Sequence, residues 1–249
     1  KKHLALLTQL IHYGNKVLLS LGTPEKHASK NSSLAQKEES KFGKILEIDK
    51  LELIDKINDM SKKLSLNVFS KGHRVPQGLT ILNNKVFNVE HGPKGGDELN
   101  HVIKTKNYGW PIVSYGTNYL KDQGGDGSAY KINHNREGFE EPLFAFVPSI
   151  GISSLNNCPK ILNNYYKKPC LMALSLYGNN LRKGYSIVIF LLNDKSSKID
   201  SLEKISLNNL VLRHFVTDQK NELYEDNNGD IYISVDKKGI YRVSFENFR

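Results

Sequence analysis

The sequence predicts an all-β domain. Short apolar and β-branched runs recur along the 249-residue chain, and Gly, Asn and Asp separate them at intervals of about ten residues. Helical periodicity is weak outside one segment, whereas a parallel α/β fold needs helices of about 10–15 residues between successive strands. These observations favour a sandwich, a barrel or a propeller. The recurring unit of turn and strand suits the small four-stranded blades of a propeller.

Four predicted strands are bounded by turn residues. Gly14-Asn15 and Gly43 precede two short apolar runs, and Asn83-Asn84 separates two others. Asparagine tolerates the positive φ of a two-residue hairpin, so the last two runs are expected to pair as antiparallel strands. The four predicted strands are residues 17–21, 45–48, 79–82 and 86–89.

Two further segments carry clear periodicity. Residues 229–243 alternate apolar and polar positions on either side of Lys237-Lys238-Gly239, which predicts another hairpin. Apolar residues recur at helical spacing in segment 51–64, which predicts one short helix or a long excursion between strands. Segments 23–41 and 120–141 are rich in Ser, Lys, Glu, Gly and Asn and are expected to be long loops, which in compact domains often bind ligands.

Charge distribution and hydropathy argue against a nucleic-acid partner and against a membrane span. The 35 Lys and Arg residues outnumber 26 Asp and Glu residues, giving a formal net charge of +9. The lysines are scattered among Asn and Ser, whereas a nucleic-acid surface needs clustered basic residues interleaved with aromatic ones, so no nucleic-acid partner is expected. The most apolar stretch, 186–192, is far shorter than the ~18 residues of a membrane span. Lys1-Lys2-His3 has no apolar signal core, so any targeting segment is expected outside this chain.

One stretch concentrates the residues that carry chemistry. Residues 72–111 hold the only Trp and much of the Gly, His and Pro of the chain. Such residues fix backbone carbonyl and amide groups in unusual directions, which a metal ion or a flat anionic ligand requires. Asp97 and Glu98 offer hard oxygen ligands, and Arg74 offers a planar fork for carboxylates. The alternative is a string of tight turns with Arg74 in a surface salt bridge.

Three blocks in this stretch, GHRVPQGL, EHGPKGGDELN and NYGWPIVSYGTNY, resemble the soluble glucose/sorbosone dehydrogenase family, the pyrroloquinoline quinone-dependent aldose sugar dehydrogenases. The likeness is tight over residues 71–119 and looser towards both ends. It implies a β-propeller of the six-bladed type, with the quinone flat at one end of the channel and calcium beneath it. About four blades are expected here, as a single propeller domain over residues 1–249 that is incomplete at its N-terminus.

The resemblance also implies cofactor-binding residues. Arg74 matches the arginine that contacts the quinone, and Val75 stands where an Asn usually follows, so one hydrogen bond to the cofactor is expected to be lost. Tyr119 falls where a cofactor-contacting tyrosine sits. In the later blades, Tyr177 and Arg213 occupy places where the family carries cationic contacts, and only Arg213 keeps the charge.

Metal and catalytic residues follow from the same resemblance. Gly92 and Pro93 match carbonyls that face the active-site calcium, and Glu98 and Tyr108 match positions assigned to calcium in bacterial aldose dehydrogenases. The family uses a histidine as general base for the sugar hydroxyl, and counting back along the chain places His3 at that position without the accompanying glycines and arginine. His12 is a weaker candidate. His73 and His91 are expected to orient their loops.

The implied function is oxidation of the C1 hydroxyl of aldose sugars to the lactone, with pyrroloquinoline quinone, calcium and an external electron acceptor, in the periplasm or outside the cell. The alternative is a catalytically inactive propeller that binds a glycan or a protein, because propellers host many functions. Cys158 and Cys170 could form one small-loop disulfide or remain two thiols. Because the family is exported, we expect them to lie close together and to pair.

Overall fold

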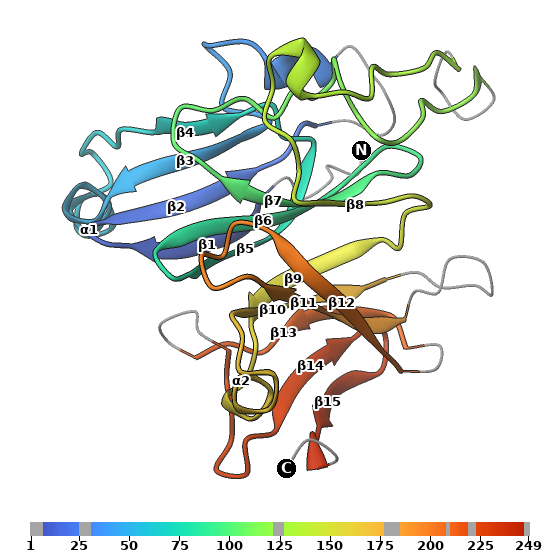
Figure 1. The fold of residues 1–249 in the computed structure, drawn as a ribbon. Coiled ribbons are helices and arrows are strands. Elements are labelled where there is room, and N and C mark those ends of the chain that lie inside the picture. The colour runs from blue at the N-terminus through green and yellow to red at the C-terminus, as the bar shows by residue number, and fades with distance from the viewer. Residues whose placement is uncertain are drawn as a thin grey trace.

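The computed structural model describes residues 7–24, 31–121, 127–176, 185–207, 210–218 and 223–246. Its strands form four antiparallel sheets, and in each sheet the strands are neighbours in the order in which they occur along the chain. Figure 1 shows these sheets following one another from the blue N-terminal strands to the red C-terminal ones. The all-β prediction is confirmed.

The first two sheets contain eight strands. The first sheet consists of β1 (Leu7–Tyr13), β2 (Lys16–Leu21), β3 (Lys44–Asp49) and β4 (Asn67–Lys71). The second consists of β5 (Val75–Leu82), β6 (Lys85–His91), β7 (Asp97–Val102) and β8 (Phe144–Phe146). All four strands predicted from turn residues lie within these elements.

The last two sheets complete the described strands. The third sheet consists of β9 (Ile152–Asn157), β10 (Cys170–Ser175), β11 (Ser186–Leu192) and β12 (Ile199–Ser206). The fourth consists of β13 (Leu212–Phe215), β14 (Ile231–Val235) and β15 (Gly239–Val243). The predicted C-terminal hairpin is confirmed as β14 and β15, with Lys237 and Gly239 at positive φ in the turn.

The sheets pack face to face around their first strands. β1 contacts β5, β5 contacts β9, and β9 contacts β13. One apolar cluster lies between each pair of neighbouring sheets, as expected when twisted sheets stack like blades. Burial on both faces explains why β10 and β11 read as continuous apolar runs: Met172 faces the fourth sheet, whereas Leu171 faces the second.

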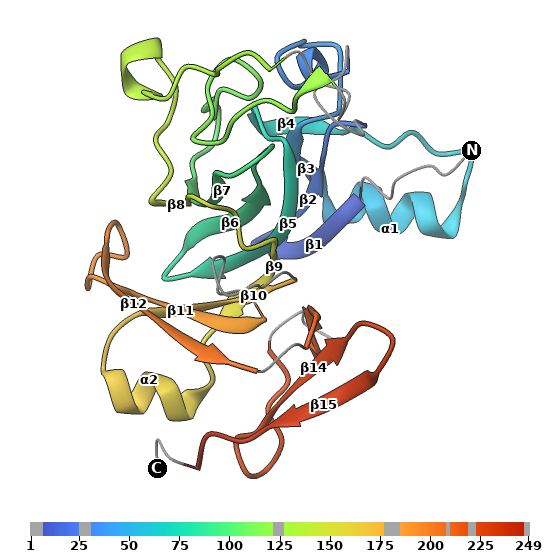
Figure 2. The same cartoon turned by 90° about the vertical axis from the view of Figure 1, so that its right-hand side faces the viewer.

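Local signals in the sequence explain the turns and helices. Asn83 and Asn84 adopt φ of 50° and 58° between β5 and β6, as the hairpin prediction requires. Helix α1 (Lys50–Asn58) begins where the side chain of Asp49 accepts the backbone N–H groups of Leu51 and Glu52. It is shorter than the 51–64 segment and stands beside the first sheet, as Figure 2 shows, with its apolar residues exposed. Sequence reasoning missed α2 (Lys160–Tyr166), which has no side-chain cap.

The two cysteines are joined by a disulfide that links β10 to the residue following β9. Their Cα atoms lie 5.3 Å apart, within the range that an unforced bridge spans. The backbone N–H of Cys158 also donates to the carbonyl of Cys170 at 3.1 Å. The predicted pairing is confirmed.

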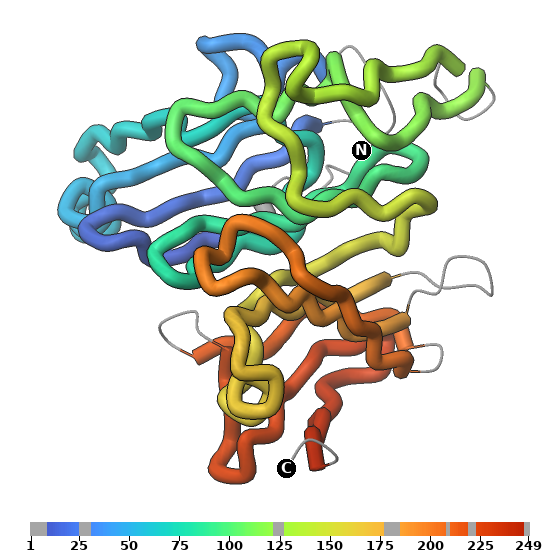
Figure 3. The backbone as a smooth tube through the Cα atoms, viewed as in Figure 1, coloured from blue at the N-terminus to red at the C-terminus, as the bar shows by residue number. Residues whose placement is uncertain are grey.

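Two segments distant in sequence meet at one end of the sheets. Figure 3 shows the chain around residues 31–43 lying beside the connection between β7 and β8. Gln36 fixes this contact, because its side-chain amide donates to the backbone carbonyl of Trp110 at 2.6 Å and exchanges hydrogen bonds with Asn107. Within the described ranges, no helix has the length and apolar character needed to cross a membrane.

Candidate functional site

An open cleft of about 780 Å³ lies at this loop-rich end of the second sheet. Its walls come from the residue before β5, the end of β6, the β6–β7 loop, the start of β7, the β7–β8 connection and the loop before β9. The residues that line it are Arg74, His91, Gly92, Pro93, Lys94, Gly95, Asp97, Thr117, Tyr119, Val147, Pro148, Ser149 and Gly151. Four of the residues predicted from the sequence are therefore brought together: Arg74, Gly92, Pro93 and Tyr119.

Arg74 is held from several sides at the back of the cleft. Its carbonyl accepts the backbone N–H and the hydroxyl of Thr23, while its Nη1 donates to the carbonyls of His91 (3.2 Å) and Gly92 (2.7 Å). Its guanidinium lies over the ring of Trp110, 5.2 Å from the ring centroid. The side chain is mostly buried, and its Nε has no hydrogen-bond partner. Arg74 is thus a preorganised cation with donor capacity left.

The β6–β7 loop turns two backbone carbonyls towards predicted cofactor contacts. Gly92 O accepts from Arg74, and Pro93 O accepts the hydroxyl of Tyr119 at 2.7 Å. A Cβ atom at Gly92 would collide with the carbonyls of Gly95 and Gly96, so only glycine fits at this position. Each carbonyl oxygen has two lone pairs, so both can accept a further donor or ligate a cation.

Asp97 joins two walls of the cleft. Its carboxylate accepts from the backbone N–H groups of Gly92 (3.2 Å), Ile150 (3.1 Å) and Ile152 (3.0 Å) and from the hydroxyl of Ser149 (2.8 Å). Although it is almost fully buried, the four donors balance its charge. Asp97 therefore ties the β6–β7 loop of the second sheet to the loop that begins the third.

One ring nitrogen of His91 is hydrogen-bonded to the backbone. Its Nε2–H donates to the carbonyl of Ile152 at 2.6 Å, which leaves Nδ1 as the acceptor of a neutral ring. Burial lowers the pKa of His91, with the Asp97 carboxylate opposing the shift and Arg74 adding to it. The neutral ring is the form that this environment favours.

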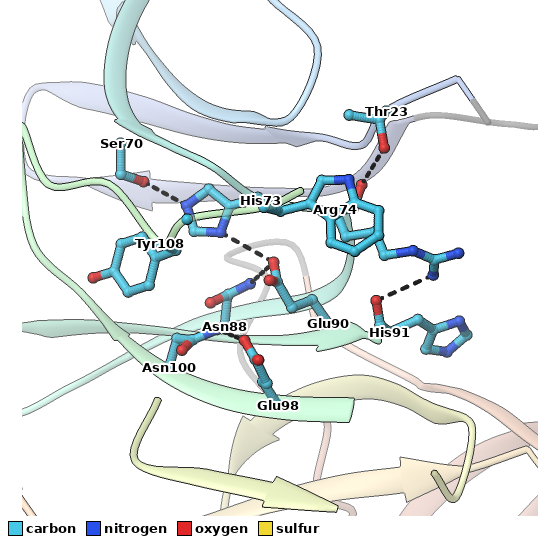
Figure 4. Close-up of polar contacts among 12 residues, drawn as sticks. Thr23, Ser70, His73, Arg74, Asn88, Glu90, His91, Glu98, Asn100 and Tyr108 are labelled. Atoms are coloured by element: carbon cyan, nitrogen blue, oxygen red, sulfur yellow. Dashed lines mark hydrogen bonds and ion pairs between the residues drawn. The ribbon is translucent and has the colours of Figure 1, made fainter. Parts of the chain in front are cut away.

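Behind the cleft, β6 and β7 present a buried polar face towards the first sheet. Glu90 lies opposite Glu98 in the antiparallel register, and Asn88 lies opposite Asn100. Figure 4 shows His73 between Ser70 and Glu90, with Glu98 beyond. His73 Nδ1 is 3.0 Å from Glu90 Oε2, and its Nε2 is 2.9 Å from the Ser70 hydroxyl.

The amides and carboxylates of this face are incompletely paired. Each Asn donates to the Glu of its own strand at 3.3 Å, and the side-chain carbonyls of Asn88 and Asn100 have no partner. Burial raises the pKa of Glu98 well above its ordinary value, and the neighbouring Glu90 carboxylate adds to this shift. Glu98 Oε1 is 3.9 Å from His134 Nε2, beyond hydrogen-bond distance. A carboxylate in this setting needs a proton or a cation.

Tyr108 lies on the same inner side, stacked on His73 with ring centroids 4.7 Å apart. Its hydroxyl donates to the carbonyl of His101 and accepts the backbone N–H of Ile103 at 2.9 Å. Burial raises the pKa of this phenol. A small cavity of about 10 Å³ is lined by Tyr108, Glu98 and Ser114, together with the cleft residue Arg74.

The other predicted residues do not line the cleft. Val75 begins β5, where it pairs with His91. Arg213 lies in β13, half exposed, and binds Asp236 at 3.2 Å. His12 is exposed on β1. His3 and Tyr177 lie outside the described residues.

Several site residues carried no sequence signal that assigned them a role. Lys94 lies in the EHGPKGGDELN block directly after the predicted ligands Gly92 and Pro93, but no sequence pattern assigned a role to its side chain. His134 comes from the 120–141 loop segment and stacks on Tyr115, with ring centroids 5.1 Å apart. Only the tertiary fold brings it near Glu98. Among the described residues, no group of three or more His, Cys, Asp or Glu side chains is placed to hold a metal.

Comparison with known proteins shows the family of this chain. The model of the glucose/sorbosone dehydrogenase family matches residues 8–186. The chain belongs to this family. It is 37% identical over 94 residues to the aldose sugar dehydrogenase YliI of Escherichia coli. This match covers 35% of this chain and 23% of YliI. It is 37% identical over 84 residues to quinoprotein glucose dehydrogenase B of Acinetobacter calcoaceticus, covering 33% of this chain and 17% of the relative.

Solved structures confirm the β-propeller fold. A glucose dehydrogenase crystal structure superposes with a TM-score of 0.66 at 22% identity, and the alignment covers 94% of this chain and 62% of that one. The apo-form of the soluble aldose sugar dehydrogenase from Escherichia coli gives 0.63 at 22% identity with the same coverage. The chain thus spans less than two thirds of these structures, and its matched regions span less than a third of the curated relatives.

Proposed function

We propose that the protein oxidises the C1 hydroxyl of aldose sugars to the lactone, using pyrroloquinoline quinone and calcium and passing electrons to an external acceptor. The observation that carries this proposal is the convergence of Arg74, Tyr119 and the carbonyls of Gly92 and Pro93 on one cleft. The name of a similar structure, the PQQ-bound form of an aldose sugar dehydrogenase from Streptomyces coelicolor, supports the choice of quinone.

The cleft fits an anionic aromatic cofactor. Arg74 lines the cleft, lies over Trp110 and is held by two backbone carbonyls through Nη1 alone, so the proposal uses the rest of its planar fork for a carboxylate of the cofactor. The Tyr119 hydroxyl donates to the carbonyl of Pro93, so the tyrosine is held against the β6–β7 loop at the cleft wall. Val75 supplies no polar side chain beside Arg74, which supports the expected loss of one cofactor hydrogen bond.

Two places fit calcium. The carbonyls of Gly92 and Pro93 offer hard oxygen at the cleft wall, and the buried Glu98 lacks a cationic partner within hydrogen-bond distance. When bound, the quinone accepts hydride and the cation polarises its carbonyl. We propose that Gly92 and Pro93 hold the cation in the cleft, and that Glu98 holds one in the cavity behind it. Tyr108, the other residue expected to bind calcium there, lines this cavity, but its hydroxyl is taken by the backbone of His101 and Ile103. His3, outside the described residues, remains the proposed general base.

A periplasmic or secreted location is part of the same proposal. The Cys158–Cys170 disulfide supports it, because such bonds persist in oxidising compartments.

A catalytically inactive propeller that binds a glycan or a protein is the second candidate. Arg213 favours it, because this expected cofactor cation is paired with Asp236 and does not line the cleft. Without the later-blade cations, the affinity for a tricarboxylate falls, since a hydrogen bond to a charged group contributes about 1.5–3 kcal/mol.

The decisive experiment is titration of the full-length protein with pyrroloquinoline quinone in the presence of calcium, followed by aldose oxidation with an artificial electron acceptor. We expect lactone formation, loss of quinone binding in Arg74→Ala, and tighter binding in Val75→Asn. Absence of quinone binding in both the natural protein and Val75→Asn would favour the non-enzymatic propeller.

A further inference from the structure

The acidic and basic side chains that line the cleft differ in how far their charge is already paired within the protein. Asp97 is almost fully buried, and its oxygens are taken by four protein donors. Arg74 lines the cleft and, within the described ranges, forms no salt bridge, because its Nη1 binds backbone carbonyls only. Lys94 is exposed at the rim of the same cleft. The cleft therefore presents positive charge to its contents, and an anion is the ligand that this charge favours.

Lys94 is anchored through its backbone while its ammonium stays available. Its N–H donates to the carbonyl of Thr117 (3.2 Å), and its own carbonyl accepts the backbone N–H (3.0 Å) and hydroxyl (3.2 Å) of Thr117. Gly95 and Gly96, both at positive φ, follow it. Within the described ranges, no carboxylate forms a salt bridge with Lys94, whereas Lys106 and Lys131 each pair with a glutamate.

We infer that Lys94 is the second cationic contact for the anionic ligand of this cleft and forms with Arg74 a two-point clamp for two carboxylates. This inference rests on the proposed function, since it takes a polycarboxylate as the ligand. Arg74 binds the buried end with a planar fork, and Lys94 binds at the rim as a point charge. Lys94 thereby replaces, from the second sheet, a cation that Arg213 in the fourth sheet does not bring to the cleft.

The test is equilibrium binding of pyrroloquinoline quinone, without sugar or electron acceptor, to the purified protein and three variants. Lys94→Gln should weaken binding about tenfold or more, because the lost contact is charge-assisted, and should make the affinity less dependent on salt. Lys94→Arg should retain most of the affinity. Lys63→Gln makes the same change in net charge at an exposed lysine outside the cleft and should bind like the natural protein.

A second probe, benzene-1,3,5-tricarboxylate, separates the clamp from the quinone function. If the natural protein binds this probe but not the quinone, and Lys94→Gln weakens the binding, then the clamp stands and the quinone function fails. If Lys94→Gln binds both ligands as tightly as the natural protein, the clamp is overturned while the quinone function stands. Binding of neither probe to the natural protein would overturn both.

Discussion

The strand pair β6–β7 carries two buried faces whose chemistry differs in the half nearer the cleft, whereas further along Val86 and Val102 pack into the apolar cluster against the first sheet. The face towards the third sheet holds Phe87, Val89 and Leu99, which are fully buried in the apolar cluster between the two sheets. The face towards the first sheet holds Asn88 and Glu90 opposite Asn100 and Glu98, also buried. Because side chains alternate along a strand, the same residues that make the core of one interface place a polar site in the other.

The two faces differ in how completely their polar groups are paired. Asp97, at the cleft end of the apolar face, has four donors around its carboxylate. On the polar face, the side-chain carbonyls of Asn88 and Asn100 have none. Leaving buried polar groups unpaired costs stability. The apolar face stabilises the propeller through burial, and the polar face is the one on which the proposed calcium site at Glu98 depends.

The largest expected effect comes from breaking the apolar face. Leu99→Ala should lower the free energy of unfolding by about 2–5 kcal/mol, because it removes a fully buried side chain and leaves a cavity. Chemical denaturation would measure this loss. Leu51→Ala in α1, where the side chain is 72% exposed, is the matched control and should change stability by less than about 0.5 kcal/mol. Equal effects at both positions would contradict the assignment of Leu99 to the core.

The polar face is tested with calcium. At a calcium concentration about 100 times its dissociation constant, binding should stabilise the natural protein by ~2.7 kcal/mol, a rise in melting temperature of roughly 5–10 °C. Glu98→Gln keeps the size of the side chain but removes the anionic ligand, so this variant should gain less. Calorimetry with and without calcium measures both. Folded natural protein that shows no stabilisation at millimolar calcium would overturn the proposed metal sites.

A smaller effect is expected from Lys44, a buried polar residue of the first sheet whose ammonium donates to the carbonyls of Leu34, Ala35 and Phe42. Burial lowers its pKa from 10.5 to about 8. Between these two values the unfolded chain holds the proton more tightly than the folded chain, so the free energy of unfolding rises with pH in this window.

Comparison of the natural protein with Lys44→Met isolates this contribution. From pH 8 to pH 10 the natural protein should gain stability relative to the variant, by at most about 1.4 kcal/mol per pH unit. Denaturant unfolding at several pH values measures the gain, and Lys63→Met, at an exposed lysine, should show none. Parallel stability curves for the natural protein and Lys44→Met would mean that Lys44 does not titrate in this window.

Turn chemistry explains why much of the fold could be predicted from the sequence. Asn83-Asn84 and the Gly239 of Lys237-Lys238-Gly239 allowed both hairpins to be predicted, because Asn and Gly adopt positive φ readily. Helix α2 was missed because its first turn carries no acidic residue and no capping side chain. The predicted helix over 51–64 ended early, at Asn58, and the apolar stripe that suggested it contacts no core.

The sequence by itself determined the all-β class, the hairpins and the family resemblance, because local turns and contiguous motifs encode them. The resemblance in turn implied Arg74, Gly92, Pro93 and Tyr119 as site residues, and the tertiary structure brings them to one cleft. Tertiary structure alone decided that the Asp97 carboxylate would bind backbone groups of the cleft walls and that Glu98 would lie buried opposite Glu90. It also decided that Lys94 would lie at the rim, where no carboxylate of the described residues forms a salt bridge with it. These outcomes depend on strand register and on loops that meet across the sheets, and neither is written in the spacing of any one segment.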